Sequence, residues 1–96
     1  MLIRAQDKVE IVNLDNIVSI YTIINNKKET EIKYHAGQTL NNRYLGTYSS
    51  EEKAIKVLDM IHTAYENTYS QLSTNGLLIT SCKKVFNMPA DEEVEV

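Results

Sequence analysis

The sequence has few of the features that are typical of a secreted or membrane protein. Its single cysteine, Cys82, cannot form an internal disulfide, and no Asn-X-Ser/Thr glycosylation acceptor occurs. No apolar run approaches the roughly 20 residues that a membrane-spanning helix needs, and residues 1–4 do not have the layout of a signal peptide. We therefore expect a cytoplasmic protein.

The sequence also lacks a recognisable catalytic, metal-binding or phosphate-binding motif. Asp59, His62 and Glu66 share one face of an expected helix, but no matching set of ligands occurs elsewhere, so a solvated polar face is the favoured interpretation. Cys82 precedes two lysines, which favour a reactive thiolate, although an incidental cysteine is favoured here as well. We predict that the protein is not an enzyme and that it holds neither a cofactor nor a metal ion.

Composition and charge indicate one folded domain followed by an acidic segment. The chain has 96 residues, of which 43% are hydrophobic and 24% charged, proportions that are ordinary for a globular protein. The net charge is −3, but four of the 13 acidic residues lie in the last six positions, so the rest of the chain is close to neutral. We predict a single α+β domain over residues 1–89 and an acidic C-terminal tail over residues 90–96.

One long amphipathic helix is predicted over residues 50–72. Ser49 is the expected N-cap, with Glu52 as its partner in a capping box, and Gly76 is suited to the turn after the helix. The apolar stripe predicts that Leu58 and Ile61 are among the most buried residues. Its members recur at steps of three and four and are Ala54, Leu58, Ile61, Tyr65, Tyr69 and Leu72, widened by Ile55 and Val57.

The remaining periodic segments predict strands, with turns or loops between them. Residues 1–5 and 9–12 are expected to form a hairpin, and residues 17–24, rich in β-branched side chains, a central strand. Alternation over residues 29–34 predicts a half-buried strand. Further segments are a turn at 25–28, a loop at 35–42, a strand at 45–48, and apolar segments at 77–80 and 84–88. The predicted fold is α+β, an antiparallel sheet of four to six strands with the helix packed on one face.

Tyrosine is over-represented relative to the other aromatic residues, with six tyrosines, one phenylalanine and no tryptophan. Candidates for a sheet face are Tyr21, Tyr34, Tyr44 and Tyr48. The basic residues Lys27 and Lys28 are favoured as a solvated edge. An aromatic and cationic patch around residues 33–44 could bind a partner or stack a base. The predicted site residues are Lys33, Tyr34, His35, Arg43 and Tyr44.

Four blocks of the sequence, residues 1–8, 12–16, 45–54 and 85–89, together resemble a family of small prophage-encoded proteins of low-GC Gram-positive bacteria. The blocks are specific as an ordered set and span most of the chain, but residues 23–42 match no pattern. The family brings no catalytic residues, so no role passes to any position. The resemblance implies a phage accessory protein acting in the cytoplasm of the host cell.

We consider three hypotheses for the function. The first is non-catalytic binding of a host protein, as an anti-defence inhibitor or a regulator. The alternative is an oligomeric nucleotide-binding sponge that uses the aromatic and cationic patch. The third, a small enzyme, has no acid, base or nucleophile constellation to support it. We also expect self-association, because residues 17–24 and 29–35 are predicted strands that a single helix cannot cover, which leaves a sheet edge or face available to a second copy. We expect no membrane binding, and the sequence gives no direct evidence for nucleic-acid binding.

Overall fold

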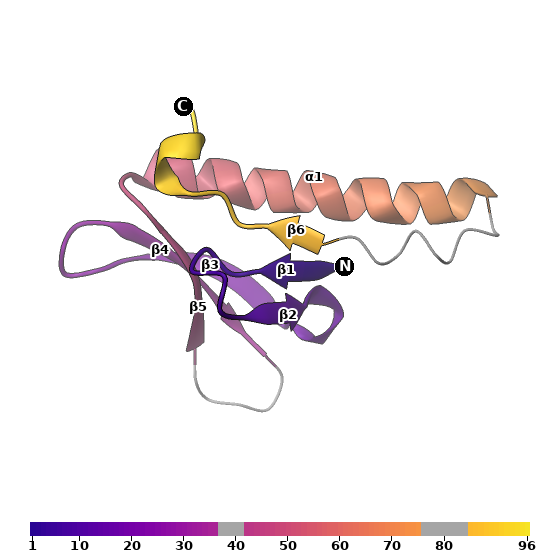
Figure 1. Cartoon of the computed structure of the whole chain (residues 1–96), viewed down its shortest axis with the longest axis horizontal. Coiled ribbons are helices and arrows are strands. Elements are labelled where there is room, and N and C mark those ends of the chain that lie inside the picture. The colour runs from indigo at the N-terminus through magenta and orange to yellow at the C-terminus, as the bar shows by residue number, and fades with distance from the viewer. Residues whose placement is uncertain (37–41, 76–84) are drawn as a thin grey trace.

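The computed structural model describes residues 1–36, 42–75 and 85–96, with side chains for 1–36, 42–67 and 85–96. Within these ranges the chain forms six strands and one long helix, which confirms the predicted α+β class (Figure 1). The strands are β1 (Leu2–Arg4), β2 (Ile11–Asn13), β3 (Ser19–Ile24), β4 (Thr30–His35), β5 (Asn42–Tyr48) and β6 (Val85–Asn87). The helix is α1 (Glu51–Asn75), and two short 3-10 turns are η1 (Leu14–Asn16) and η3 (Asp91–Glu93).

The strands lie in two three-stranded sheets, so the prediction of a single antiparallel sheet is wrong. The first sheet has the order β2-β1-β6, with β1 antiparallel to β2 and parallel to β6. The second has the order β3-β4-β5 and is antiparallel throughout. Because β1 is already paired along both edges, it cannot extend the second sheet. The two sheets instead meet where the Gln6 N–H donates to the Leu45 carbonyl oxygen at 2.7 Å.

The predicted hairpin over residues 1–12 is present, and the predicted turn at 25–28 joins β3 and β4 as a second hairpin. β1 pairs with β2 through a turn in which Lys8 has φ of 65°, and β3 pairs with β4 through a turn in which Lys28 has φ of 63°. The Asn25 side-chain oxygen accepts from the N–H groups of Lys27 and Glu29 at 2.9 and 3.0 Å, which holds the second turn. These are local interactions, and for this reason the turn chemistry could be inferred from the sequence.

The predicted central position of residues 17–24 is wrong, because among the described residues β3 is an edge strand and β4 is the centre of its sheet. Val18 and Ile24 are 68% and 62% exposed. The alternation predicted for β4 is confirmed, since Thr30, Ile32 and Tyr34 are buried and the residues between them are not. A run of β-branched residues indicates a strand, but the number of its partners depends on the rest of the chain.

The core lies between α1 and the two sheets, and α1 contacts all three strands of the second sheet. Val57 is fully buried and Ile61 is 4% exposed, whereas Leu58 is only partly buried and Ile55 is 45% exposed. The prediction for Ile61 is thus confirmed, and the buried stripe is rotated toward Val57. Apolar residues occur on both sides of the predicted stripe, so the packing partner selects the face.

The helix begins one residue later than predicted and uses a different cap. The Ser50 hydroxyl oxygen accepts from the Lys53 N–H at 3.2 Å, so Ser50 is the N-cap. The predicted N-cap, Ser49, instead donates its N–H to Asp91 Oδ1 at 2.8 Å. Both Ser49 and Ser50 are suitable N-cap residues by local preference. In the structure Asp91 binds the Ser49 N–H, and Ser50 caps the helix.

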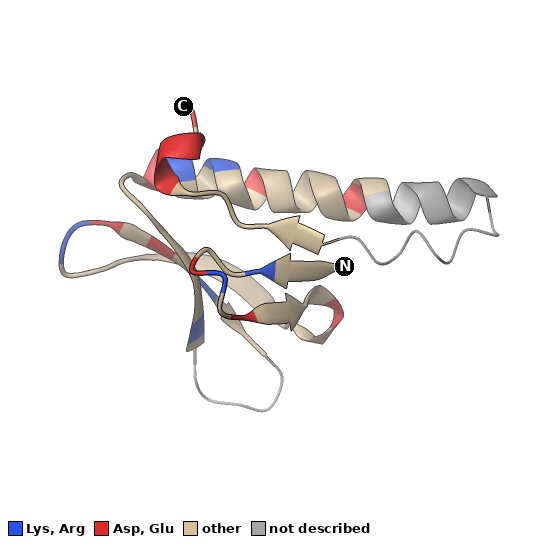
Figure 2. Ribbon diagram, in the orientation of Figure 1, with Lys and Arg blue, Asp and Glu red and all other residues tan. Residues whose placement is uncertain are grey.

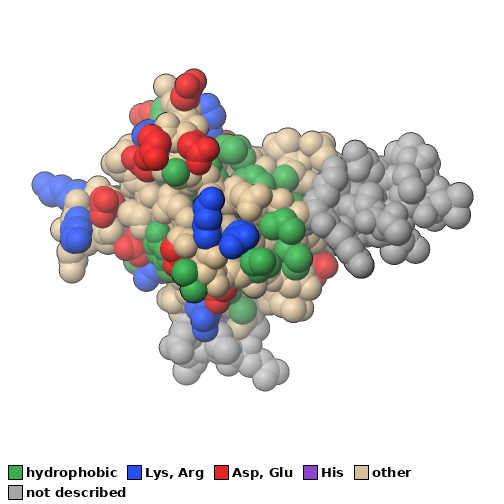
Figure 3. All heavy atoms as spheres, viewed as in Figure 1, with side chains coloured by type: hydrophobic (Ala, Val, Ile, Leu, Met, Phe, Trp, Pro, Cys, Tyr) green, Lys and Arg blue, Asp and Glu red, His purple; other side chains and the backbone are tan. Residues whose placement is uncertain are grey.

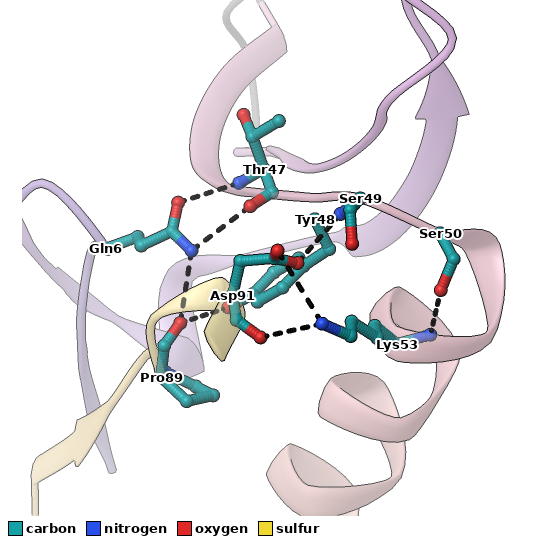
Figure 4. A network of polar contacts seen from close by, with 8 residues as sticks. All are labelled: Gln6, Thr47, Tyr48, Ser49, Ser50, Lys53, Pro89 and Asp91. Carbon is teal, nitrogen blue, oxygen red and sulfur yellow. Dashed lines mark hydrogen bonds and ion pairs between the residues drawn. The ribbon is translucent and has the colours of Figure 1, made fainter. Parts of the chain in front are cut away.

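A polar junction joins three segments that are remote in sequence (Figure 4). Gln6 Nε2 donates to the carbonyl oxygens of Thr47 and Pro89, both at 3.1 Å, and Gln6 Oε1 accepts from the Thr47 N–H at 2.9 Å. The hydroxyl of the fully buried Tyr48 donates to the same Pro89 oxygen at 2.7 Å. Burial raises the pKa of Tyr48 well above its usual value, so the phenol remains a donor.

The segment predicted as an acidic tail is folded against the start of α1. Figure 2 shows acidic residues of this segment beside basic residues in the first turns of the helix. Lys53 Nζ donates to the Asp91 carbonyl oxygen at 3.1 Å and lies 3.6 Å from Asp91 Oδ2, while Lys56 Nζ donates to the Glu95 carbonyl oxygen. Val94 is 4% exposed. Residues 90–96 therefore contribute both charge and apolar contact to the domain.

Several predictions fall outside the described residues. They concern the middle of the loop (37–41), the helix stop at Gly76, the apolar segment 77–80 and Cys82. Within the described residues, no helix is both long enough and apolar enough to cross a membrane.

We expect Gly46→Ala to destabilise the domain. A Cβ at this position would lie 3.1 Å from the ring of Tyr48 and 3.4 Å from Gln6 Cβ, and Tyr48 cannot move away because it is fully buried and bound to Pro89. The cost should be about 1–3 kcal/mol in the free energy of unfolding, measured by urea denaturation. Asn42→Ala, at an exposed position of the same strand, is the control, and equal stability of the two variants would contradict this packing.

Alanine substitutions on α1 should distinguish its buried side from its exposed side by their effect on stability. Ile61→Ala removes a buried side chain and should cost about 2–5 kcal/mol, whereas Ile55→Ala, at a 45% exposed position, should change stability by no more than about 0.5 kcal/mol. Thermal unfolding of both variants checks the orientation of α1. Comparable losses would show that the helix is rotated from the position described.

The docked acidic segment should make stability depend on pH. The hydrogen bond from Ser49, supported by Lys53, lowers the pKa of Asp91 below its ordinary value of 3.8. The charged form is therefore favoured in the folded state, and its stabilising effect is present above pH 3.8 and is lost as the pH falls through the lowered pKa. Unfolding midpoints measured across this acidic range should fall less steeply for Asp91→Asn than for the wild type. Parallel curves would reject the contact.

Candidate functional site

The five predicted site residues are divided between two faces of the β3-β4-β5 sheet. Cross-strand partners share a face, and Lys33 lies opposite Tyr44 while Tyr34 lies opposite Arg43. Tyr34 is buried with the core, so its face is the inner one. Lys33, His35 and Tyr44 therefore belong to the outer face, which we define as the side of this sheet turned away from the core.

A tyrosine-lysine-tyrosine row crosses the outer face. Tyr21 on β3 lies opposite Lys33 on β4, which lies opposite Tyr44 on β5. All three side chains are partly exposed, and His35 is partly exposed on the same face. Since neighbouring strands are about 4.8 Å apart, the two tyrosines flank the lysine at a separation of about 10 Å. The sequence provided Tyr21 as a candidate for the sheet face, but only the register places it in this row.

Polar contacts hold two members of the row, Lys33 on β4 and Tyr44 on β5. Lys33 Nζ lies 3.7 Å from Glu31 Oε1, and both side chains are less than one-third exposed. The Tyr44 hydroxyl donates to Gln6 Oε1 at 3.0 Å, which connects the outer face to the polar junction. The paired carboxylate offsets the lysine charge, so the outer face is nearly neutral and rich in tyrosine.

Tyr34 and Arg43 form a separate cluster with Glu10. The Tyr34 hydroxyl donates to Glu10 Oε1 at 3.2 Å, and Arg43 donates to Glu10 Oε2 at 3.0 Å. Tyr34 is 3% exposed, and burial, followed by the negative charge of Glu10, raises the pKa of its phenol. The cluster fastens the β1-β2 turn to the second sheet. Glu10 is 24 residues from Tyr34 in sequence, and no sequence signal links the two.

A shallow hollow lies beside this cluster. It has a volume of about 280 Å³ and is lined by Ala5, Asp7, Val9, Glu10, Arg43 and Tyr44. The arginine in it is already bound to Glu10, and Asp7 Oδ1 accepts from the Val9 N–H at 2.9 Å. The charged groups that line the hollow are therefore engaged with the protein itself.

The open edge of β3 adjoins an apolar groove that the sequence reasoning missed. The groove has a volume of about 330 Å³ and runs between η1, β3 and α1, lined by Leu14, Ile17, Ile20, Leu58, Ile61, His62 and Tyr65. We call it the β3 groove. A signal available in the sequence is the absence of charged residues from 16 to 26, whereas the prediction of a central strand rests on the β-branched residues of this segment.

The view in Figure 3 shows a different kind of surface. There, hydrophobic side chains reach the surface in separate groups among acidic and basic ones. Exposed apolar residues of the first sheet and its turn include Val9, Ile11 and Val85. The described part of this view is thus chemically mixed.

Two of the three possible metal ligands on α1, His62 and Glu66, interact with each other. His62 Nε2 lies 2.6 Å from Glu66 Oε1, and both side chains are more than 60% exposed. Among residues 1–36, 42–67 and 85–96, no group of three or more His, Cys, Asp or Glu side chains is arranged to hold a metal ion.

Comparison of the chain with protein-family models, with curated proteins and with solved structures finds no significant match. The resemblance to prophage-encoded proteins therefore remains a prediction.

Proposed function

We propose that the protein acts without turnover, by binding a host protein through the outer face of the β3-β4-β5 sheet. The observation that carries this proposal is the partly exposed row of Tyr21, Lys33 and Tyr44 across three strands. Tyrosine combines an apolar ring with a polar tip and is enriched in protein interfaces. The resemblance to phage accessory proteins supports a partner in the host, whose activity would be inhibited or regulated by the complex.

The charge of the outer face favours a protein over a phosphate-containing ligand. Glu31 lies beside Lys33, and Arg43 is bound to Glu10 on the other side of the sheet, so cationic groups that could receive phosphates are already paired. Ile23, which is 47% exposed on the same face, adds apolar surface next to the row. A nearly neutral surface of tyrosine and isoleucine with a few polar groups suits the centre of a protein interface.

The second candidate is the nucleotide-binding sponge, and the spacing of the row favours it. Tyr21 and Tyr44, whose strands β3 and β5 lie about 10 Å apart on either side of β4, could stack bases, with Lys33 between them as a hydrogen-bond donor. This function would require that the ligand displace Glu31 from Lys33. Binding should then strengthen when Glu31 is replaced by glutamine.

Both candidates are tested with the tagged protein recovered from host cells. The expected result is one host protein in stoichiometric amount, retained by the wild type and lost from Tyr21→Ser/Lys33→Ser. The matched control, Val9→Ser/Ile11→Ser, changes exposed residues of the first sheet and its turn and should keep the partner. All variants should retain the wild-type melting temperature within a few degrees, because the altered side chains lie outside the core.

A nucleotide released from the purified protein by heat, together with calorimetric binding of a nucleoside monophosphate that Glu31→Gln strengthens, would support the sponge instead. Equal capture by both double variants would reject the outer face as the binding surface.

A further inference from the structure

We infer that β3 is the interface of a two-fold homodimer, in which it pairs antiparallel with the partner's β3 and joins the two β3-β4-β5 sheets into one six-stranded sheet. The inference is independent of the identity of the bound host partner. Within the described residues, β3 has a strand neighbour only on the β4 side. The opposite edge of the sheet is different, because Gln6 bonds to the backbone of β5 there.

Backbone N–H and C=O groups of β3 point to its open edge, where another strand could pair with them. Across the turn, the Asn25 N–H donates to the Glu29 carbonyl oxygen at 2.9 Å. Following the two-residue period of an antiparallel ladder, the backbone groups of Ile20, Thr22 and Ile24 then point to the open edge. Protein edges are commonly protected by lysine, proline or a bulge. Residues 16–26 contain no charged residue and no proline.

The two-fold symmetry restricts the register. An axis perpendicular to the sheet keeps the outer face of one copy continuous with that of the other, and paired residues must share a face. Tyr21 opposite the partner's Tyr21 satisfies this condition. The same register sets Ile24, which is 62% exposed, opposite the partner's Val18, which is 68% exposed in the single chain. Two of the most exposed aliphatic side chains thereby cover each other, and the two-fold axis repeats this contact at the other end of the strand pair.

Charge complementarity also supports a second copy as the occupant. In this register Lys27, at the tip of the β3-β4 hairpin, is level with the partner's Asp15 at the other end of the strand pair. Both residues are exposed, and Figure 2 shows the basic tip of this hairpin far from the acidic C-terminal segment. The symmetry axis repeats the contact, so each end of the shared strand pair combines a basic turn with an acidic residue.

The β3 groove provides the apolar part of the interface. It lies along the same edge, and the two-fold axis brings the grooves of both copies face to face. Ile20 and Leu58, which are only partly buried in the single chain, would then lie in an interior. Burial of such a surface is the main favourable contribution in most protein associations.

The dimer would also complete the outer face. Tyr21 would lie beside the partner's Tyr21, so the tyrosine-lysine-tyrosine row would extend across six strands, with each copy contributing half. The partner copy thus supplies residues to the surface proposed to bind the host protein.

The first test is molar mass by sedimentation velocity from low to high micromolar concentration. The expected mass is twice the 11.0 kDa of one chain. Ile24→Lys places a charge on the open edge and should yield the monomer. Ile11→Lys, an exposed isoleucine to lysine change on the edge strand of the other sheet, should remain dimeric. A monomeric wild type, or a dimer that persists in Ile24→Lys, would overturn the inference.

The register can be tested by exchanging the charges of Lys27 and Asp15, because this test compares single variants with a double variant that should recover dimerisation. Lys27→Asp and Asp15→Lys should each raise the dimer dissociation constant several-fold, and the double variant should restore it. Additive losses in the double variant would overturn this register. A dimer that captures no host protein would reject the proposed function alone, and a monomer that captures one would reject the dimer alone.

Discussion

The Pro89 carbonyl oxygen accepts hydrogen bonds from Tyr48 and from Gln6, and the rest of the structure depends on this contact. Tyr48 ends β5 just before α1, Gln6 follows β1, and Pro89 follows β6. The two donors therefore fix the start of the helix, the meeting of the two sheets and the path of the C-terminal segment at one point. A buried hydroxyl without an acceptor would cost about 1–3 kcal/mol, so alternative arrangements of these three segments are disfavoured.

The second sheet is asymmetric in both its faces and its edges. Its inner face contributes Ile32 and Tyr34 to the core, whereas its outer face has the tyrosine-lysine-tyrosine row. On the β5 edge the Gln6 side chain takes the place of a neighbouring strand. The β3 edge has no such cover within the described residues, and it is uncharged and apolar. The core residues of this sheet therefore lie on its inner face, apart from the outer face that we propose for binding.

The candidate site could be predicted only in part from the sequence. The enrichment in tyrosine and the grouping of the residues between 33 and 44 were visible in the sequence, but the cross-strand register places Lys33 beside Tyr44. Tyr34 and Arg43 were grouped with them by proximity in sequence, but their cross-strand pairing places them on the opposite face with Glu10. Face assignment on β5 also depends on a register shift opposite Ile32 and Lys33, for which the sequence offers no local signal.

The sequence by itself determined the local features of this protein: the α+β class, both hairpins, the alternation of β4 and the long helix after β5. Each follows from periodicity or turn chemistry within a few residues. Only the tertiary structure decided that the strands form two sheets, that β3 lies at an edge, that Ser50 rather than Ser49 caps α1, and that residues 90–96 pack on the helix. Several of these outcomes depend on contacts between segments that are remote in sequence, such as Asp91 with Ser49, which are 42 residues apart, and local propensity cannot rank such contacts.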